Sequence, residues 1–234
     1  MRRLFSTPPY GTVWAIGFFQ EVAFFLLVNL PGRLQQLGVG EAGIGVAYSA
    51  SALAALLLRP WFGRILDVVR RRTVLRTAGI LNIAATLTLS TVDETGLTLW
   101  LAFLAQRVLQ ILLFTTLLAY AADSVPVELR TQGLAVFGLS GLVPIAVANL
   151  LGDALISFAD YPGLIVAAAT AGAVSWVLVW RLPLLPVLGS RPRRSFWAVV
   201  TQRDLLPLWW ITFMFSVGME VMFTFMRTFI NARP

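Results

Sequence analysis

Charged and amide side chains interrupt the long apolar runs of this sequence at a few positions, and these are the residues whose types could do chemistry. Glu21 lies about 12 Å along the first apolar run and Arg107 about 15 Å along the fourth, at the helical rise per residue. Gln106 and Gln110 are one helical turn apart and share a helix face. Because such groups are costly in lipid and normally face a cavity or a partner, we hypothesise that Glu21 and Arg107 face a common central cavity.

Two other interpretations of these charges stay open. Glu21 and Arg107 could form a structural ion pair and nothing more. If Glu21 instead lacks a cationic partner, it is a candidate proton carrier. Three further polar residues are candidates for lining the same cavity, namely Asn29 on the Glu21 face of the first run, Asn149 in the fifth run and Glu220 in the last.

Several chemistries are excluded by residue type. The chain has no Cys and no His, and all 18 of its basic residues are Arg. Disulfides, thiolate catalysis, Cys/His metal sites and imidazole acid–base catalysis are therefore ruled out. There is no Walker-type phosphate loop and no nucleophile–base constellation, so we predict neither an enzyme nor a bound cofactor or metal.

The composition is that of a membrane protein. Of 234 residues, 58% are hydrophobic and only 12% are charged, which is too few charges to cover a water-facing surface. We therefore predict an all-α membrane protein that crosses the bilayer several times. The apolar runs are long enough for seven spans, at Val13–Leu30, Gly43–Leu58, Val74–Thr91, Leu97–Ala122, Leu134–Phe158, Leu164–Trp180 and Leu208–Ile230.

The arginines predict the orientation of these spans. With the N-terminus in the cytoplasm, 14 arginines fall on the inner side and 2 on the outer side, which is the positive-inside pattern. The net charge of +7 therefore reflects topology, and we predict no nucleic-acid partner. The expected location is the cytoplasmic (inner) cell membrane, and the C-terminus as given falls outside.

A proline-rich segment divides the chain. We predict a six-helix bundle over 1–183, a cytoplasmic linker over 184–207 and the first helix of an incomplete second bundle over 208–234. Within the linker, 195–202 could form a short interfacial helix or an unstructured hinge. The segment beginning at Glu220 repeats the segment beginning at Glu21 with three identities in six positions, as two parallel bundle repeats would.

The connection between spans two and three carries a motif. Gly63 permits close approach of a neighbouring backbone, and Asp67 is a single acid among six arginines. Such an acid can hold two helices together through charge-assisted hydrogen bonds that break in a conformational switch. The alternative, that the arginines only set topology, stays open.

This segment resembles the loop signature of the major facilitator superfamily, Gly-x-Leu-Ala-Asp-Arg-x-Gly-Arg-Arg. Gly63, Asp67, Arg71 and Arg72 occupy its positions, whereas Val68 and Arg70 depart from it. The stretch from Leu30 to Gly45 is similar to the family's loop before the second helix.

Two further spans carry parts of the resemblance. Arg107 and Gln110 resemble the family's fourth-helix Arg-x-x-Gln-Gly pattern, which is tied to proton coupling in exporters, with Ile111 in place of the Gly. Span five, with Gly138, Gly141 and Pro144, resembles a degraded form of the fifth-helix motif of drug–proton antiporters. Ordinary helix packing explains the span-five pattern equally well.

The resemblance implies a six-helix bundle of the major facilitator superfamily (MFS) type plus a seventh helix. It also implies a secondary transporter that moves a small solute by alternating access. The implied partners are the lipid bilayer, an unknown small molecule, protons if transport is coupled, and a missing C-terminal half or a second copy. The alternatives are a non-transporting membrane interaction or assembly subunit and an inactive fragment of a twelve-helix transporter. Substrate and direction stay open.

Overall fold

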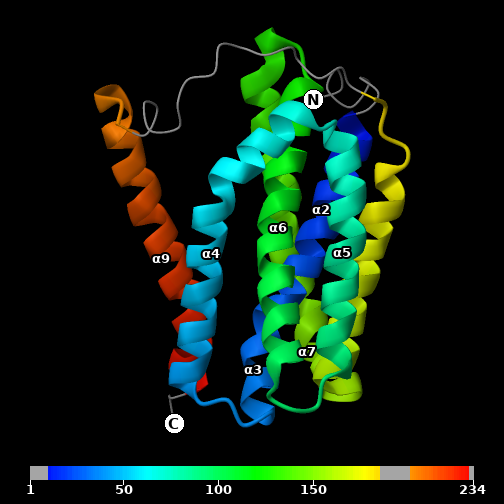
Figure 1. Ribbon diagram of the computed structural model, residues 1–234, viewed down its shortest axis with the longest axis vertical. Helices are drawn as coiled ribbons and strands as arrows, with labels where there is room; N and C mark the ends of the chain where they lie inside the picture. Colours follow the sequence, from blue (N-terminus) through cyan, green and yellow to red (C-terminus); the bar gives the residue numbers. More distant parts are fainter. Residues whose placement is uncertain (1–9, 185–200, 232–234) are drawn as a thin grey trace. The chain divides into compact units, whose positions relative to one another are not determined.

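The long apolar runs form long α-helices in the computed structural model, which describes residues 10–184 and 201–231, with side chains up to 218 (Figure 1). No strand occurs among these residues, which confirms the prediction of an all-α protein. In chain order the elements are α2 (Tyr10–Leu26), η1 (Leu27–Asn29), α3 (Leu30–Gln36), α4 (Glu41–Val68), α5 (Arg71–Thr91), α6 (Leu97–Asp123), η2 (Val127–Leu129), α7 (Arg130–Val179), η3 (Arg203–Leu205) and α9 (Leu206–Asn231).

Helix α7 is two membrane-length helices joined at a kink. It has 50 residues, and Asp160 within it has a φ of 55°, in the left-handed region that non-glycine residues rarely adopt. The carboxylate of Asp160 accepts hydrogen bonds from its neighbour's amide, Tyr161 N, at 2.8 Å and from Gln36 Nε2 at 3.3 Å. These bonds stabilise a break at the connection predicted between spans five and six.

Five helical segments are long and apolar enough to cross a membrane by length and composition, as far as the described residues were searched. Since α7 covers two predicted spans, these five account for the first six spans, and α9 overlaps the seventh. The chain divides into two compact units, 1–188 and 189–234. The interfacial helix considered over 195–202 lies almost wholly outside the described residues.

The first unit has two main apolar clusters, one toward each end of its helices. The first apolar cluster includes Val13 of α2, Leu75 of α5, Leu113 of α6 and Val179 of α7. The second apolar cluster draws on the same four helices and includes Leu26, Leu89, Leu99 and Leu164. Between the two clusters along these helices lie the buried polar side chains of Gln20, Glu21, Asn82, Gln106, Gln110 and Ser175, which we call the polar layer.

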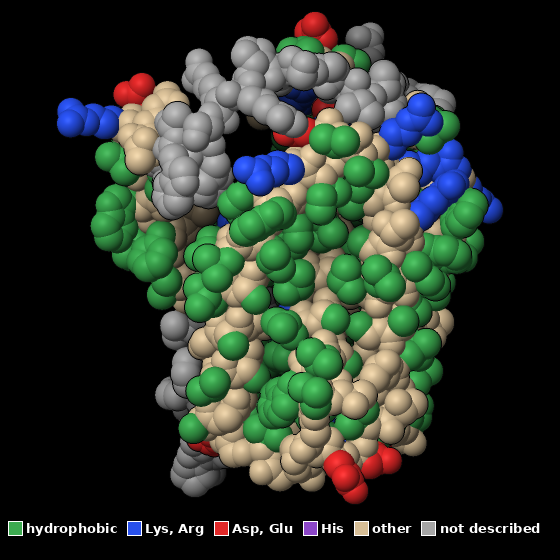
Figure 2. Space-filling model, viewed as in Figure 1, with side chains coloured by type: hydrophobic (Ala, Val, Ile, Leu, Met, Phe, Trp, Pro, Cys, Tyr) green, Lys and Arg blue, Asp and Glu red, His purple; other side chains and the backbone are tan. Residues whose placement is uncertain are grey.

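Salt bridges join helices at both ends of the first unit. Arg71, at the start of α5, pairs with Asp123 at the end of α6. At the other end, Arg33 of α3 pairs with Asp93 in the α5–α6 loop, with Nη2 and Oδ1 2.8 Å apart. Figure 2 shows basic side chains gathered at the end where α4 stops and α5 begins, as the predicted topology requires.

Glycines let α2 and α5 pack closely against α7. A Cβ placed on Gly17 of α2 would lie 2.7 Å from Ser140 Oγ and 3.0 Å from Phe137 Cε2 of α7. A Cβ on Gly79 of α5 would lie 2.7 Å from Trp176 Cδ1. Close approach of this kind is how helices associate in lipid, where the hydrophobic effect between them is weak.

We predict that Gly17→Val destabilises the bundle by about 1–3 kcal/mol, because added methyl groups overpack the contact with Ser140 and Phe137. The measurement is the thermal unfolding midpoint of the purified protein in detergent. Gly141→Val is the matched control, since a Cβ at Gly141 meets nothing within 4 Å. Equal shifts in both variants would show that the α2–α7 contact is not close-packed.

Candidate functional site

Four helices meet at the polar layer through side-chain hydrogen bonds. Gln20 Nε2 of α2 donates to Gln110 Oε1 of α6 at 2.6 Å, and Asn82 Nδ2 of α5 approaches the same oxygen at 3.5 Å. Ser175 Oγ of α7 lies 3.3 Å from Gln20 Oε1 and 3.2 Å from the backbone oxygen of Ile16. These four side chains are buried, so the hydrogen bonds fix how the helices face one another.

Gln106, one turn before Gln110 on α6, is also buried but is not part of this network. Neither its Nε2 nor its Oε1 has a hydrogen-bond partner among the described residues. An unpaired buried amide costs about 1–3 kcal/mol for each unsatisfied group. Folding alone does not account for a glutamine here.

Glu21 follows Gln20 on α2 and is buried, with 8% of its surface exposed. Within the part of the chain that the structure describes, its carboxyl group makes no hydrogen bond or ion pair. A buried carboxyl without a cationic partner is the arrangement that the proton-carrier hypothesis requires.

Arg107 of α6 lies among aromatic rings. Its guanidinium carbon is 4.3 Å from the ring centroid of Tyr48 on α4, and 5.8 Å from those of Phe24 on α2 and Phe103 on α6. Contacts at these distances stabilise a cation through the ring faces. The two ion pairs among the described residues involve neither Arg107 nor Glu21, so no structural ion pair joins them there. The contact with Phe24 places Arg107 against α2, the helix that carries Glu21.

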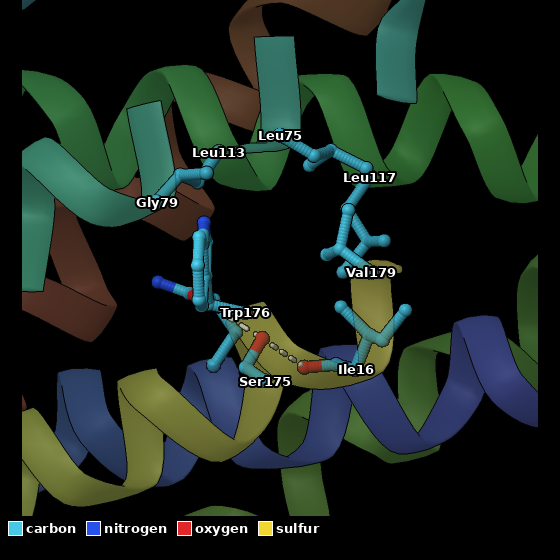
Figure 3. A pocket seen from close by; sticks show the side chains of 9 residues that line it. Ile16, Leu75, Gly79, Leu113, Leu117, Ser175, Trp176 and Val179 are labelled. Atoms are coloured by element: carbon cyan, nitrogen blue, oxygen red, sulfur yellow. Dashed lines mark hydrogen bonds between the residues drawn. The ribbon is translucent and has the colours of Figure 1, made fainter. Parts of the chain in front are cut away.

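A small cavity lies beside the polar layer, on the side of the first apolar cluster (Figure 3). Its volume is about 10 Å³, which is about the least that holds one water molecule. It is too small for a solute in this conformation. Its lining consists of Ile16, Gln20, Leu75, Gly79, Leu113, Leu117, Ser175, Trp176 and Val179.

The other predicted lining residues lie apart from this layer. Asn29 is half-buried near Gly152 of α7, and its Nδ2 donates to Leu26 O at 3.3 Å. Asn149 is exposed on α7. Glu220 belongs to α9, but its side chain lies outside the described residues.

The predicted switch motif divides into two parts. Gly63 and Asp67 of α4 are exposed, and a Cβ at Gly63 would meet nothing within 4 Å. Arg71 forms its ion pair with Asp123 and also donates to Ala119 O at 3.0 Å. Arg72 donates to the backbone oxygen of Trp180 at the end of α7.

Sequence reasoning missed three members of the polar layer. Gln20 and Asn82 had a usable signal, since an amide within an apolar run is unusual and Gln20 is next to Glu21. Ser175 had little signal, because serine is common in membrane helices.

The polar layer and the neighbouring Arg107 carry three kinds of chemistry. An amide such as that of Gln106 donates and accepts hydrogen bonds, a guanidinium such as that of Arg107 binds anionic groups, and a carboxyl such as that of Glu21 gains and loses a proton. No group of three or more acidic, Cys or His side chains suited to a metal ion occurs among the residues described.

Comparison with known proteins identifies the family of this chain. The staphylopine export protein of Staphylococcus aureus (strain Mu50 / ATCC 700699) is 30% identical to this chain over 135 residues. The aligned part covers 58% of this chain and 32% of that relative, so the chain spans about a third of the relative's length. Residues 13–233, nearly the whole chain, match the Major Facilitator Superfamily. This multi-pass, all-helical membrane protein therefore belongs to the major facilitator superfamily of membrane transporters.

Proposed function

We propose that the protein is a secondary transporter that moves a small polar solute by alternating access, with the polar layer as part of the solute path. The observation that carries this proposal is Gln106, whose two polar atoms are buried without partners in the described part of the chain. Its burial costs free energy in the resting protein, and a solute with matching hydrogen-bonding groups would recover it.

The two membrane charges support the same proposal. Arg107 is held by aromatic rings and by no acid within the described residues, which leaves its charge available to an anionic group of a solute. Glu21, equally unpaired there, would couple transport to protons by gaining and losing one during the cycle. Asn29, Asn149 and Glu220 stay proposed contributors to the path.

Alternating access needs two bundles that rock against each other. We propose that 1–183 is one bundle, that 184–207 is a cytoplasmic linker and that 208–234 begins the second. The exposed Gly63 and Asp67 would then belong to a conformational-switch loop, with Arg71 and Arg72 anchoring the motif to α6 and to the end of α7. We further propose insertion in the cytoplasmic membrane with the N-terminus inside.

Export is the direction we favour, because the relative from Staphylococcus aureus is an export protein. The test uses inside-out vesicles that contain the product of the intact reading frame. We expect accumulation of a polar solute driven by a proton gradient, with staphylopine tried first and other small polar solutes after it. Failure of every solute, in vesicles where the protein is folded and correctly inserted, would favour the non-transporting assembly subunit.

We predict that substitutions of two glutamines of α6 affect stability and transport differently. Gln110→Leu should destabilise the protein by about 1–3 kcal/mol, because Gln20 and Asn82 lose their shared acceptor. Gln106→Leu should leave stability unchanged or higher, because it removes two unsatisfied buried atoms. It should still slow transport by about tenfold, the loss for one hydrogen bond of about 1.4 kcal/mol to the solute.

Thermal unfolding in detergent and initial transport rates in vesicles measure the two properties separately. If the Gln106→Leu protein transports at the normal rate, Gln106 is not part of the solute path. A loss of stability as large as that of Gln110→Leu would show that Gln106 is a structural residue instead.

We predict that Glu21→Gln abolishes solute accumulation driven by a proton gradient but retains solute counterflow, in which no net proton movement is needed. The amide keeps the shape of the side chain and removes its ionisation. Glu94→Gln is the matched control, since Glu94 is exposed in the α5–α6 loop. Gradient-driven accumulation that survives Glu21→Gln would refute proton coupling through this residue.

A further inference from the structure

A second cluster, of three arginines and two tryptophans, lies where the start of α5 meets the end of α7. Arg72 and Arg76 are one turn apart on α5, and Trp176, Trp180 and Arg181 belong to the last turn of α7 and the residues after it. We call these five residues the arginine–tryptophan seam. The proposed transport cycle uses only the Arg72 anchor and leaves the remaining four residues without a role.

Direct contacts assemble the seam. The guanidinium carbon of Arg76 lies 3.7 Å from the ring centroid of Trp180. The indole nitrogen of Trp176 donates to the backbone oxygen of Arg76 at 2.8 Å, and Arg72 Nη2 donates to the backbone oxygen of Trp180. These contacts hold two guanidinium groups at a defined place between two helices.

The positive charge of the seam has no acidic counterpart in the described residues. The two ion pairs found there involve Arg33 and Arg71, and Asp123 is already paired with Arg71. In addition, the Nε atoms of Arg72 and Arg76 are buried without hydrogen-bond partners. Two guanidinium groups held close together, with the exposed Arg181 next to Trp180 in the sequence, supply the positive charge that an anion with several oxygen atoms requires.

The surroundings favour the headgroup of a lipid over a free ion. Trp180 is 51% exposed, and tryptophans concentrate where membrane helices meet the headgroup region. Further along the same two helices, toward the membrane interior, Ile80 of α5 and Val177 of α7 are exposed and apolar. A phosphate bound at the arginines would therefore have its acyl chains beside an apolar surface.

We propose that the arginine–tryptophan seam binds the phosphate of an anionic phospholipid. Arg76 and Arg181 supply the charge, Trp180 orients Arg76, and Arg72 secures the end of α7 beside them. The site depends on the chain being in a membrane and on no property of the transported solute.

The test counts bound phosphatidylglycerol by native mass spectrometry of the purified full chain, with phosphatidylcholine as the neutral comparison. The double variant Arg76→Gln/Arg181→Gln should bind phosphatidylglycerol more weakly by about fivefold for each arginine, the value expected for a basic residue at a membrane surface. The matched control is Arg59→Gln/Arg64→Gln, which removes the same charge from exposed positions of α4. It should bind as the unmodified protein does.

Three results would overturn the proposal. If the control variant weakened binding equally, the effect would come from net charge alone. If phosphatidylcholine bound equally well, the site would not require an anionic headgroup. Full displacement by glycerol phosphate at the same concentration would identify a site for free phosphate esters. The single variant Arg181→Gln tests the proposal without risk of misfolding, because the Arg181 side chain makes no described contact that the substitution would remove. It should still weaken phosphatidylglycerol binding about fivefold.

Discussion

The structure of the first unit depends on placing hydrogen-bonding side chains in the middle of an apolar bundle. Apolar faces alone specify helix rotation poorly in lipid, since acyl chains are as apolar as leucine. The bonds that link Gln20, Gln110 and Ser175 satisfy their groups only when α2, α6 and α7 have one particular rotation and height. The two apolar clusters on either side then pack in register, so the polar layer gives a largely apolar bundle one defined arrangement.

Two glutamines of the polar layer differ in whether their amides have hydrogen-bond partners. Gln110 is satisfied by neighbouring helices and contributes to stability, whereas Gln106, one turn away on the same helix, has no partner among the residues described. A bundle selected for stability alone would carry an apolar residue at such a position. The same reasoning applies to Glu21 and Arg107, neither of which forms an ion pair among the described residues. The proposed solute path therefore depends on these unpaired polar groups in a well-packed interior.

Much of the fold follows from the sequence, because apolar run length alone determines where a helix can cross lipid. Asp160 illustrates this, since the break in α7 falls inside the predicted connection. The rarity of charged and amide side chains in such runs also singled out Glu21, Gln106 and Arg107 as candidate site residues. The hydrogen-bond and ion-pair partners of these residues could not be predicted, because a sequence specifies which residues share a helix face but not which neighbouring helix that face contacts. Arg71 pairs with Asp123, 52 positions along the chain and on another helix, although Asp67 is much closer in sequence.

The arginines show why counting charges is an incomplete description of such a protein. Several of them donate to backbone oxygens near helix C-termini, where the last carbonyl groups lack partners within the helix. A guanidinium can make such a bond while it also pairs with an acid or stacks on a ring, whereas an ammonium is a point charge without that geometry. An arginine that fits the predicted topology, such as Arg72, therefore also ties one helix end to another, so the predicted orientation and the packing depend on some of the same residues. The bonds are Arg33 to Val92, Arg71 to Ala119, Arg72 to Trp180 and Arg130 to Ala122.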